Sequence, residues 1–364
     1  MKSRAAISYG PGVPLEVDEI DLEDPRPDEV VVRMAAVGIC GTDLHQIKGE
    51  WQRPTPIVLG HEGSGVIERA GSQVDPARVG ERVVLAWSAS CGSCRDCARG
   101  RPAACVVLHR AMAAGTLVDG TTGLSLRGQR LYRGTATGAL GERIVVKDRL
   151  ALPVGDDVPL DQAALLGCAA LTGVGAVLFA ARPPRGAVIV VLGVGGVGQF
   201  CVQGARLSNA RLVICADPLA SRRSRALKLG ATHAVNPSEL ADVLAELAPE
   251  GADFAFDVVG TSESTVLALQ STRSGGTTII VGLPPAGARL DLDFAEFNRR
   301  EKWLTGTMYG SEDPAVAMPI LLDLVRSGRL DLVSMLGPTY PLERVNDAIS
   351  ASVAGSAGRV LVAL

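Results

Sequence analysis

The stretch GAVIVVLGVGGVGQFCVQGARL, residues 186–207, decides the fold class of the second half of the chain. It begins as a β-branched run typical of a strand and ends as a run typical of a helix, with a glycine-rich turn between them. The glycines of that turn are Gly193, Gly195, Gly196 and Gly198. Glycines at this spacing permit a tight turn, close approach of the backbone to a pyrophosphate, and close packing of helix on strand. Because the helix N-terminus then faces the phosphates, the stretch predicts a dinucleotide-binding unit.

The residues after this unit indicate which dinucleotide is bound. A second predicted strand, ARLVICAD, ends at Asp217. A carboxylate at this strand tip accepts hydrogen bonds from the adenosine ribose hydroxyls and repels a 2′-phosphate. Arg222 and Arg223 follow, and guanidinium groups there offer the alternative of holding that phosphate. We expect the carboxylate to dominate, which favours NAD over NADP.

The pattern of strands and helices predicts an α/β protein with a discontinuous domain. Short apolar strands recur at 252–260 and 277–285, and their alternation with helices predicts a doubly wound parallel sheet of the Rossmann type. Residues 1–150 instead contain many short strands separated by Gly, Pro and Asp, which predicts a mostly β, partly barrel-like domain. The chain is expected to return to this domain near Tyr309 and to finish with GRVLVAL as a strand. The predicted domains are residues 1–165, 166–308 and 309–364, the first and third forming one domain.

Composition limits the classes of partner. The chain has 364 residues, 47% hydrophobic and 21% charged, with a net charge of −3, so no basic surplus favours nucleic acid. The N-terminus lacks the apolar region of a signal peptide. The longest apolar stretch, around AVIVVLGVGGVG, is shorter than the ~18 residues of a membrane span. We therefore expect a cytoplasmic protein with no nucleic-acid or membrane partner, and in that compartment disulfides are rare.

Four closely spaced cysteines predict a structural metal site. They lie in CGSCRDCARGRPAAC and are Cys91, Cys94, Cys97 and Cys105. Two residues between thiols let one turn of backbone wrap an ion, and four thiolates complete the closed tetrahedral shell of structural zinc. An iron–sulfur cluster is the main alternative, but in the common ferredoxin pattern the fourth cysteine precedes proline, and here Val106 follows.

Three further residues predict a second metal site. Cys40 lies in VGICGTDLH, His61 in VLGHEGSG and Cys168 in LLGCAALTG. A Cys₂His set leaves one of four zinc positions for water or substrate, which is the arrangement of a catalytic ion. Each residue alone is most simply a buried core side chain. The combination carries the prediction, because the ligand types and the glycine-flanked turns resemble those of a family that also has a four-cysteine lobe.

These features occur in an order that resembles the zinc-dependent alcohol dehydrogenases of the medium-chain dehydrogenase/reductase superfamily. The resemblance covers essentially the whole chain and rests on Cys40, the Gly60-His61-Glu62 turn, the four-cysteine lobe, Cys168 and the glycine turn. It identifies the β domain as GroES-like and implies two zinc ions per subunit, one catalytic and one structural, together with NAD(H). It implies that the catalytic ion lies between the two domains. It also implies hydride transfer between an alcohol and the nicotinamide.

The resemblance assigns roles to residues near the catalytic ion. Thr42 and His45 match a proton relay that runs from a hydroxyl through the coenzyme ribose to an imidazole. Asp43 is expected to orient His61. Glu62 is expected behind the metal, as an alternative ligand or as a carboxylate that tunes its field.

The resemblance also extends the set of coenzyme-binding residues beyond the glycines and Asp217. Arg222 matches a cation that contacts the adenosine ribose, and Arg359 matches a position that touches the pyrophosphate. Further residues in this set are Thr172, Val197, Val259, Val281 and Leu283. The sequence departs from many relatives at Gly41, where an Arg or His contacts the pyrophosphate, so we expect weaker coenzyme binding.

The substrate class is narrowed by aromatic residues. Trp51 and Trp87 match positions that line the substrate channel, and two indoles favour primary aliphatic or flat aromatic alcohols over bulky secondary ones. Arg110 and Arg133 are expected nearer the mouth, where they would favour an anionic or polar tail. Two alternatives stay open: a zinc-containing reductase of a C=C or C=N bond, and a thiol-dependent formaldehyde dehydrogenase. Trp51 weakens the second, because it replaces an acidic residue that some of those enzymes use for the thiol conjugate.

The segment between Cys105 and Glu142 bears on assembly. It is glycine-rich and polar, and we expect no helix in it. Its length resembles that of dimeric family members, which predicts a homodimer. A metal-free relative of the same fold would lack the seven predicted metal ligands.

Overall fold

The computed structural model describes residues 1–88, 90–356 and 358–364, which fall into two compact units. Unit 1 comprises Met1–Ala169, Asp313–Asp323 and Leu332–Leu364, and unit 2 comprises Ala170–Glu312 and Leu324–Asp331. The predicted boundaries at 165/166 and 308/309 each lie four residues before the observed ones. The predicted return segment is also interrupted, because the second part of helix α11 (Pro314–Arg326) leads the chain briefly back into unit 2.

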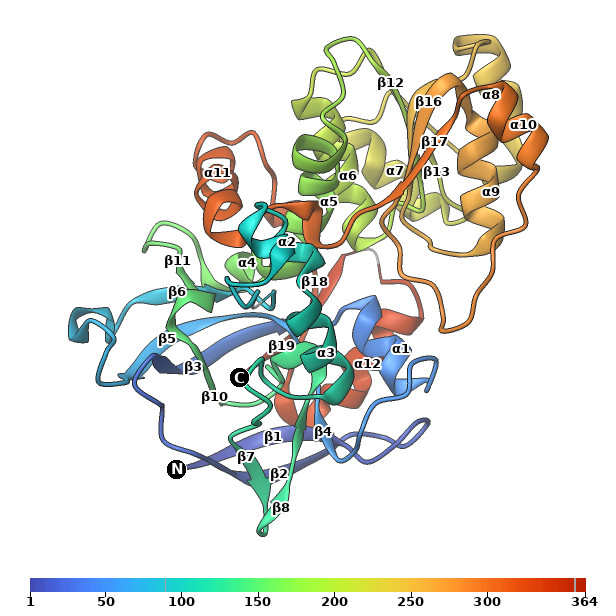
Figure 1. Cartoon of the computed structure of the whole chain (residues 1–364). Helices are drawn as coiled ribbons and strands as arrows, with labels where there is room; N and C mark the ends of the chain where they lie inside the picture. Colours follow the sequence, from blue (N-terminus) through green and yellow to red (C-terminus); the bar gives the residue numbers. More distant parts are fainter. Residues whose placement is uncertain (89, 357) are drawn as a thin grey trace. The chain divides into compact units, whose positions relative to one another are not determined.

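Unit 1 is built on two β-sheets (Figure 1). The first has the strand order β8 (Gln129–Arg130), β7 (Leu124–Leu126), β2 (Glu16–Leu22), β1 (Lys2–Ser8), β4 (Ile57–Val58), β9 (Tyr132–Arg133). The second has the order β11 (Ala151–Pro153), β6 (Arg82–Leu85), β5 (Glu62–Ala70), β3 (Glu29–Gly38), β19 (Arg359–Ala363), β18 (Leu336–Pro341), with β10 (Arg143–Lys147) also pairing with β3.

Strand β3 is the centre of unit 1. Its sequence EVVVRMAAVG is buried along most of its length, because it pairs with β5 on one edge and with β10 and β19 on the other. The C-terminal strand β19 pairs antiparallel with it, so that Leu361 lies opposite Gly38. The expected final strand is therefore present, and it adds to the sheet that carries the N-terminal metal ligands.

Unit 2 contains the parallel sheet that the glycine-rich stretch predicts. Its strand order is β14 (His233–Val235), β13 (Leu212–Ala216), β12 (Val188–Leu192), β15 (Ala252–Asp257), β16 (Thr272–Ile280), β17 (Trp303–Gly306). This is the 3-2-1-4-5-6 order of a Rossmann domain, in which the coenzyme binds where the order reverses, beside β12 and β15. Helices α6 (Gly196–Leu207), α7 (Ala220–Leu229) and α9 (Ser262–Ser271) pack against these strands (Figure 1).

The remaining α-helices connect or cover the sheets. They are α1 (Gly41–Ile47), α2 (Arg95–Ala98), α3 (Val106–Ala114), α4 (Leu160–Leu165), α5 (Leu171–Gly175), α8 (Leu240–Leu247), α10 (Phe294–Arg299) and α12 (Val345–Val353). Helix α3 corrects the expectation that the segment after Cys105 has no helix. The segment is polar and glycine-rich only beyond Ala114. Before that point the thiol of Cys105 caps the helix by accepting a hydrogen bond from the Leu108 amide, and Gly115 ends it in the left-handed conformation.

A long apolar helical run corrects the expectation about apolar length. In the described part of the chain, Leu160–Ala181 is long and apolar enough to cross a membrane by length and composition alone, with a mean hydropathy of 2.1. It comprises α4, a π-helical turn over Leu166–Ala170, α5 and a second π-helical segment. Because 78% of its most apolar window is buried inside the protein, packing within the chain accounts for its composition.

Candidate metal and coenzyme sites

The three predicted catalytic ligands converge in unit 1. Cys40 precedes α1, His61 follows β4, and Cys168 lies in the π-helical turn. The two thiol sulfurs are 3.9 Å apart, and the donor atoms of all three residues lie within 4.8 Å of one another. Their exposed fractions are 7%, 1% and 6%. Two thiols and one imidazole at these separations fit a tetrahedral zinc ion with one open position.

Asp43 holds two of the ligands in place. Its Oδ2 accepts a hydrogen bond from the backbone N–H of Cys40 at 3.0 Å, and its Oδ1 accepts one from the N–H of Gly60 at 3.0 Å. The same Oδ1 lies 3.3 Å from Nδ1 of His61. Nδ1 is thus turned toward the carboxylate, which leaves Nε2 as the metal donor. This geometry would allow Asp43 to orient His61, and that role stays a prediction.

Behind the ligands, Glu62 forms a buried ion pair with Arg359. The guanidinium donates to Oε1 at 2.6 Å and to Oε2 at 2.5 Å, and Oε2 also accepts from the N–H of Ala169 at 3.0 Å. Glu62 thereby fixes the backbone next to Cys168, and both of its oxygens are engaged. Burial raises the pKa of the Glu62 carboxyl, although Arg359 opposes this shift. The arginine that the sequence assigned to the pyrophosphate therefore has a partner that no sequence pattern indicated.

The local charges also favour a thiolate among the ligands. A hydrogen bond from the Cys168 thiol lowers the pKa of Cys40 well below its ordinary value, and Arg359 and His61 act in the same direction. The thiolate is the form that binds a metal. The groups around Cys40 therefore favour the thiolate, the form that binds a cation, in the metal-free chain.

The four-cysteine set forms the second group of metal donors in the part of the chain that the structure describes. The sulfur of Cys97 lies 3.5 Å from that of Cys94 and 4.0 Å from that of Cys91. Backbone amides point at the sulfurs: Cys94 N donates to Cys91 Sγ, and Cys91 N donates to Cys105 Sγ, both at 3.3 Å. Four thiols with amide donors around them fit the closed shell of structural zinc.

The predicted relay residues lie on α1, directly after Cys40. Thr42 is in its first turn and His45 in its last. Nδ1 of His45 is in close contact with the carboxylate of Glu50, and its ring stacks on Trp51 with centroids 4.8 Å apart and planes 20° apart. Sequence reasoning missed Glu50. The signal that could have found it is Gly49, which ends the helix and turns the chain back.

The two predicted pocket tryptophans differ in their surroundings. Trp87 is 7% exposed and meets the ring of His61 edge-on, with centroids 6.1 Å apart. Trp51 is half-buried against His45. Trp87 thus lies beside a predicted metal ligand, His61, and Trp51 lies beside His45, the imidazole predicted for the relay.

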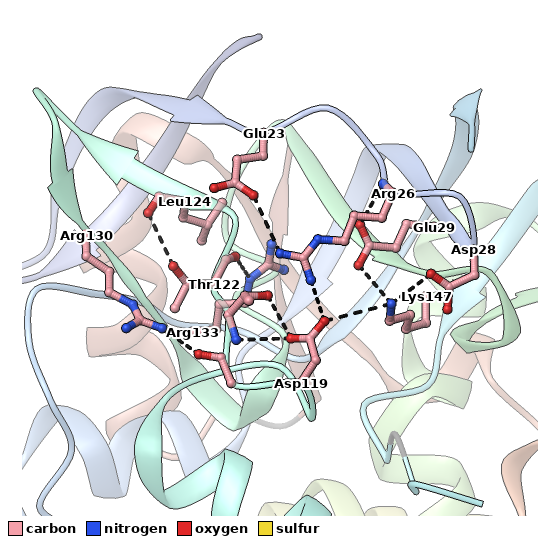
Figure 2. A network of polar contacts seen from close by, with 12 residues as sticks. Glu23, Arg26, Asp28, Glu29, Asp119, Thr122, Leu124, Arg130, Arg133 and Lys147 are labelled. Carbon is pink, nitrogen blue, oxygen red and sulfur yellow. Dashed lines mark hydrogen bonds and ion pairs between the residues drawn. The ribbon is translucent and has the colours of Figure 1, made fainter. Parts of the chain in front are cut away.

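The buried position of Arg133 corrects the expectation that it lies near the mouth of the substrate channel. It is fully buried, and its guanidinium donates to the carbonyl of Thr122 (Figure 2). It also donates to the carbonyls of Thr137 and Val145. Desolvation lowers its pKa to about 10. The side chain holds three segments of unit 1 together and is inaccessible to a substrate tail. Arg110, by contrast, is exposed on α3.

The coenzyme residues of unit 2 gather at the carboxyl ends of the parallel strands. A Cβ on Gly198 would lie 1.9 Å from the carbonyl oxygen of Gly193, so only glycine allows this turn. Asp217 follows β13 and accepts hydrogen bonds from the N–H groups of Val194, at 3.0 Å, and Leu219, at 2.9 Å.

The two arginines after Asp217 face different partners. Arg222 lies 3.7 Å from the Asp217 carboxylate. Arg223 instead donates to the backbone carbonyls of Asp217 and Pro218. Arg222 is thus the one beside the expected ribose position.

The other predicted coenzyme residues divide between the units. Val259 and Leu283 are 48% and 42% exposed, just past β15 and β16. Val281 is buried, Thr172 lies in α5 and Val197 in α6. Arg359 belongs to unit 1.

Comparisons with known proteins agree with both halves. Residues 26–156 match the alcohol dehydrogenase GroES-like domain, and residues 196–325 match the zinc-binding dehydrogenase family. The chain is 32% identical to the S-(hydroxymethyl)glutathione dehydrogenase of Photobacterium damsela subsp. piscicida over 100% of both chains. It is 36% identical to the NDMA-dependent alcohol dehydrogenase of Amycolatopsis methanolica over 95% of each.

A solved structure extends the comparison to three dimensions. The benzyl alcohol dehydrogenase of Acinetobacter calcoaceticus superposes with a TM-score of 0.94 at 28% identity, over 100% of this chain and 99% of that one. The predicted fold class, a GroES-like domain with a Rossmann domain, is confirmed. The chain belongs to the zinc-dependent alcohol dehydrogenases of the medium-chain dehydrogenase/reductase superfamily.

Proposed function

We propose that this protein is a zinc- and NAD-dependent alcohol dehydrogenase that interconverts a primary alcohol and its aldehyde. The observation that carries the proposal is the buried Cys40–His61–Cys168 set, whose donors lie within 4.8 Å of one another. A zinc ion bound there would lower the pKa of a coordinated hydroxyl toward neutrality. An alcohol that donates a hydride needs this deprotonation of its hydroxyl group.

The side chains around this set would divide the remaining work. Asp43, Glu62 and Arg359 hold the ligands and balance their charge. Thr42 is two residues from Cys40, so its hydroxyl is suited to receive the alcohol proton. His45, one helical turn further along α1, is suited to carry the proton toward solvent because its side chain is 26% exposed.

The preference for NAD follows from Asp217. Its carboxylate is held at the tip of β13 by two backbone amides, where it would accept the ribose hydroxyls and repel a 2′-phosphate. Arg222 beside it neutralises part of that charge, and this supports contact with the ribose more than capture of a phosphate.

The substrate class is inferred from Trp87 and Trp51. An indole edge-on to His61 narrows the space beside the metal, which suits flat aromatic or unbranched alcohols. The benzyl alcohol dehydrogenase with the same fold is compatible with this inference. The S-(hydroxymethyl)glutathione dehydrogenase among the relatives keeps thiol-dependent oxidation of formaldehyde as a second candidate.

The test is NADH formation, followed by absorbance, on a panel of alcohols. Benzyl alcohol and unbranched primary alcohols should be oxidised with NAD, while secondary alcohols and NADP should give much lower kcat/KM. Formaldehyde is supplied with and without glutathione. NADH formation only when formaldehyde and glutathione are both present would select the thiol-dependent candidate. The absence of turnover on every alcohol would favour a reductase of C=C or C=N bonds and overturn the proposal.

We also infer a cytoplasmic homodimer. Strand β17 is the edge of the parallel sheet, and Trp303 on it is 68% exposed. An edge strand with an exposed indole favours pairing with a second copy. Light scattering of the wild type and of Trp303→Lys tests this, because the variant should shift toward monomer. A wild-type monomer would contradict it.

A further inference from the structure

The turn after α1 brings a carboxylate against the relay imidazole. Gly49 adopts the left-handed conformation, with φ of +75°, directly after the helix. Its N–H donates to the carbonyl of Gln46 at 3.1 Å, and the N–H of Glu50 donates to the carbonyl of His45 at 3.0 Å. These two bonds define a Schellman motif, in which the second residue past the helix packs on the helical residue five positions earlier. The backbone therefore places Glu50 next to His45.

The side chains complete this contact. Oε2 of Glu50 hydrogen-bonds Nδ1 of His45, and both side chains are partly exposed, at 31% and 26%. The indole of Trp51 stacks on one face of the imidazole, and the Arg53 guanidinium lies 5.7 Å from the indole centroid. The imidazole is thus held at one nitrogen and on one face.

We propose that Glu50 is a positioning residue for His45: its carboxylate accepts the Nδ1 proton and leaves Nε2 bare to receive the proton that the alcohol releases. This inference rests on the proposed function and adds a residue to its proton path. Which imidazole nitrogen carries the proton is set by the hydrogen bond that the other nitrogen makes. A carboxylate can only accept from a neutral ring, so it selects the Nδ1–H form.

The proton balance is simple. His45 takes one proton at Nε2 and becomes an imidazolium, whose positive charge lies beside the Glu50 carboxylate. The ring then loses one proton to water through its exposed edge and returns to the neutral form. This proton step is redox-neutral, because the two electrons of the oxidation leave with the hydride, which passes separately to the coenzyme.

The first test measures the tautomer and needs no turnover. The chain has four histidines, so ring-labelled protein gives few signals, and His45→Gln identifies the signal of His45. At alkaline pH the nitrogen shifts of wild-type His45 should report the Nδ1–H form. Glu50→Gln should shift His45 toward the Nε2–H form, because an amide can also donate to a bare Nδ1. An Nε2–H form in the wild type would overturn the proposal.

The second test separates positioning from folding. Glu50→Gln should lower kcat about tenfold with KM changed less than about twofold, because proton transfer is impaired and alcohol binding is not. Glu50→Asp, which keeps the charge, should recover part of the loss. In a His45→Gln background, Glu50→Gln should have no further effect. Unchanged kcat in the single variant, or an equal loss in the double background, would refute the role.

A matched control removes an equivalent carboxylate elsewhere. Glu68 on β5 pairs with Arg143 at 2.7 Å, so Glu68→Gln loses one charge and one ion pair without touching His45. It should leave the His45 tautomer and kcat unchanged. If wild-type protein oxidises no alcohol, the proposed function fails, whereas the tautomer measurement still decides whether Glu50 sets the form of His45.

Discussion

The two metal-donor sets of this chain are built in opposite ways. The four-cysteine set lies within residues 91–105, its thiols are mostly half-buried, and backbone amides of the same short segment surround them. The other set joins Cys40 to Cys168 across 128 residues, and its members are nearly inaccessible. Its frame is made of buried charged side chains, Asp43, Glu62 and Arg359. A local set can staple a loop, whereas a set framed by distant buried charges can hold an open position in a fixed field.

The largest expected effect comes from removing a donor of the buried set. Cys40→Ser should lower kcat/KM by about a thousandfold, because a hydroxyl is a poor zinc ligand and the reacting oxygen loses its activation. Elemental analysis should fall from two zinc ions per subunit to one, and the melting temperature should change little. Wild-type protein with a single ion, held only by the four-cysteine set, would contradict this reading of the two sets.

The reciprocal change should affect stability more than catalysis. Cys97→Ser opens the four-cysteine shell, and we expect the melting temperature to fall by about 5–10 °C because the loop loses its cross-link. The kcat of the folded fraction should stay within about twofold of the wild type. Equal losses of activity in Cys97→Ser and Cys40→Ser would show that the sets do not differ in role.

The pH dependence of thiol reactivity should also separate the sets. Hydrogen bonds from backbone amides lower the pKa of Cys91 to about 6, while burial raises that of Cys97 to about 12. Since the thiolate is the nucleophile, alkylation of Cys91 in chelator-treated protein should rise with pH through about 6 and level off before ordinary thiols react. Cys97 should stay protonated and slow, and Cys40 slow because it is buried. Peptide mass spectrometry measures each rate. A Cys91 midpoint above pH 8 would contradict the expectation.

The smallest effect concerns the residue beside Cys40. A Cβ on Gly41 would have no atom within 4 Å, so the position has room for a side chain. Gly41→Arg should lower the Kd for NAD about fivefold by adding one charge-assisted contact to the pyrophosphate. Gly41→Ala is the matched control and should change nothing. Calorimetric titration measures both, and an unchanged Kd in the arginine variant would refute the contact.

The fold was predictable where a local pattern encodes it. The glycine turn after β12 predicts both the parallel sheet and its dinucleotide edge, since a Cβ on Gly198 would collide with Gly193. The spacing of the four cysteines within residues 91–105 is also a local pattern, and it predicts the four-cysteine metal set. Two predictions about helices failed because a long segment was judged by its overall composition. Helix α3 was hidden in a glycine-rich stretch, and the Leu160–Ala181 run was overlooked because π-helical turns and glycines interrupt its periodicity.

The buried charged side chains around the Cys40–His61–Cys168 set were less predictable, because residues that pair there can be far apart in the sequence. Arg359 and Glu62 are 297 residues apart, and no spacing rule connects them. Arg133 was misplaced for a different reason. Its carbonyl partners lie only 4 to 12 residues away in the sequence, but an arginine in a polar segment is expected to be exposed, and only the fold shows these carbonyls around it. Glu50 was within reach, because glycine after a short helix predicts the turn that carries it to His45.

The separation of Glu62 and Arg359 along the sequence has a consequence for biosynthesis. At a ribosomal rate of about 5–20 residues per second, synthesis of the 297 residues that follow Glu62 up to Arg359 takes about 15–60 s. Throughout that interval Glu62 lacks the guanidinium that pairs with it in the folded protein. The buried ion pair behind the Cys40–His61–Cys168 set therefore cannot form until Arg359 has been synthesised, whereas all four cysteines of the loop are available from residue 105 onward.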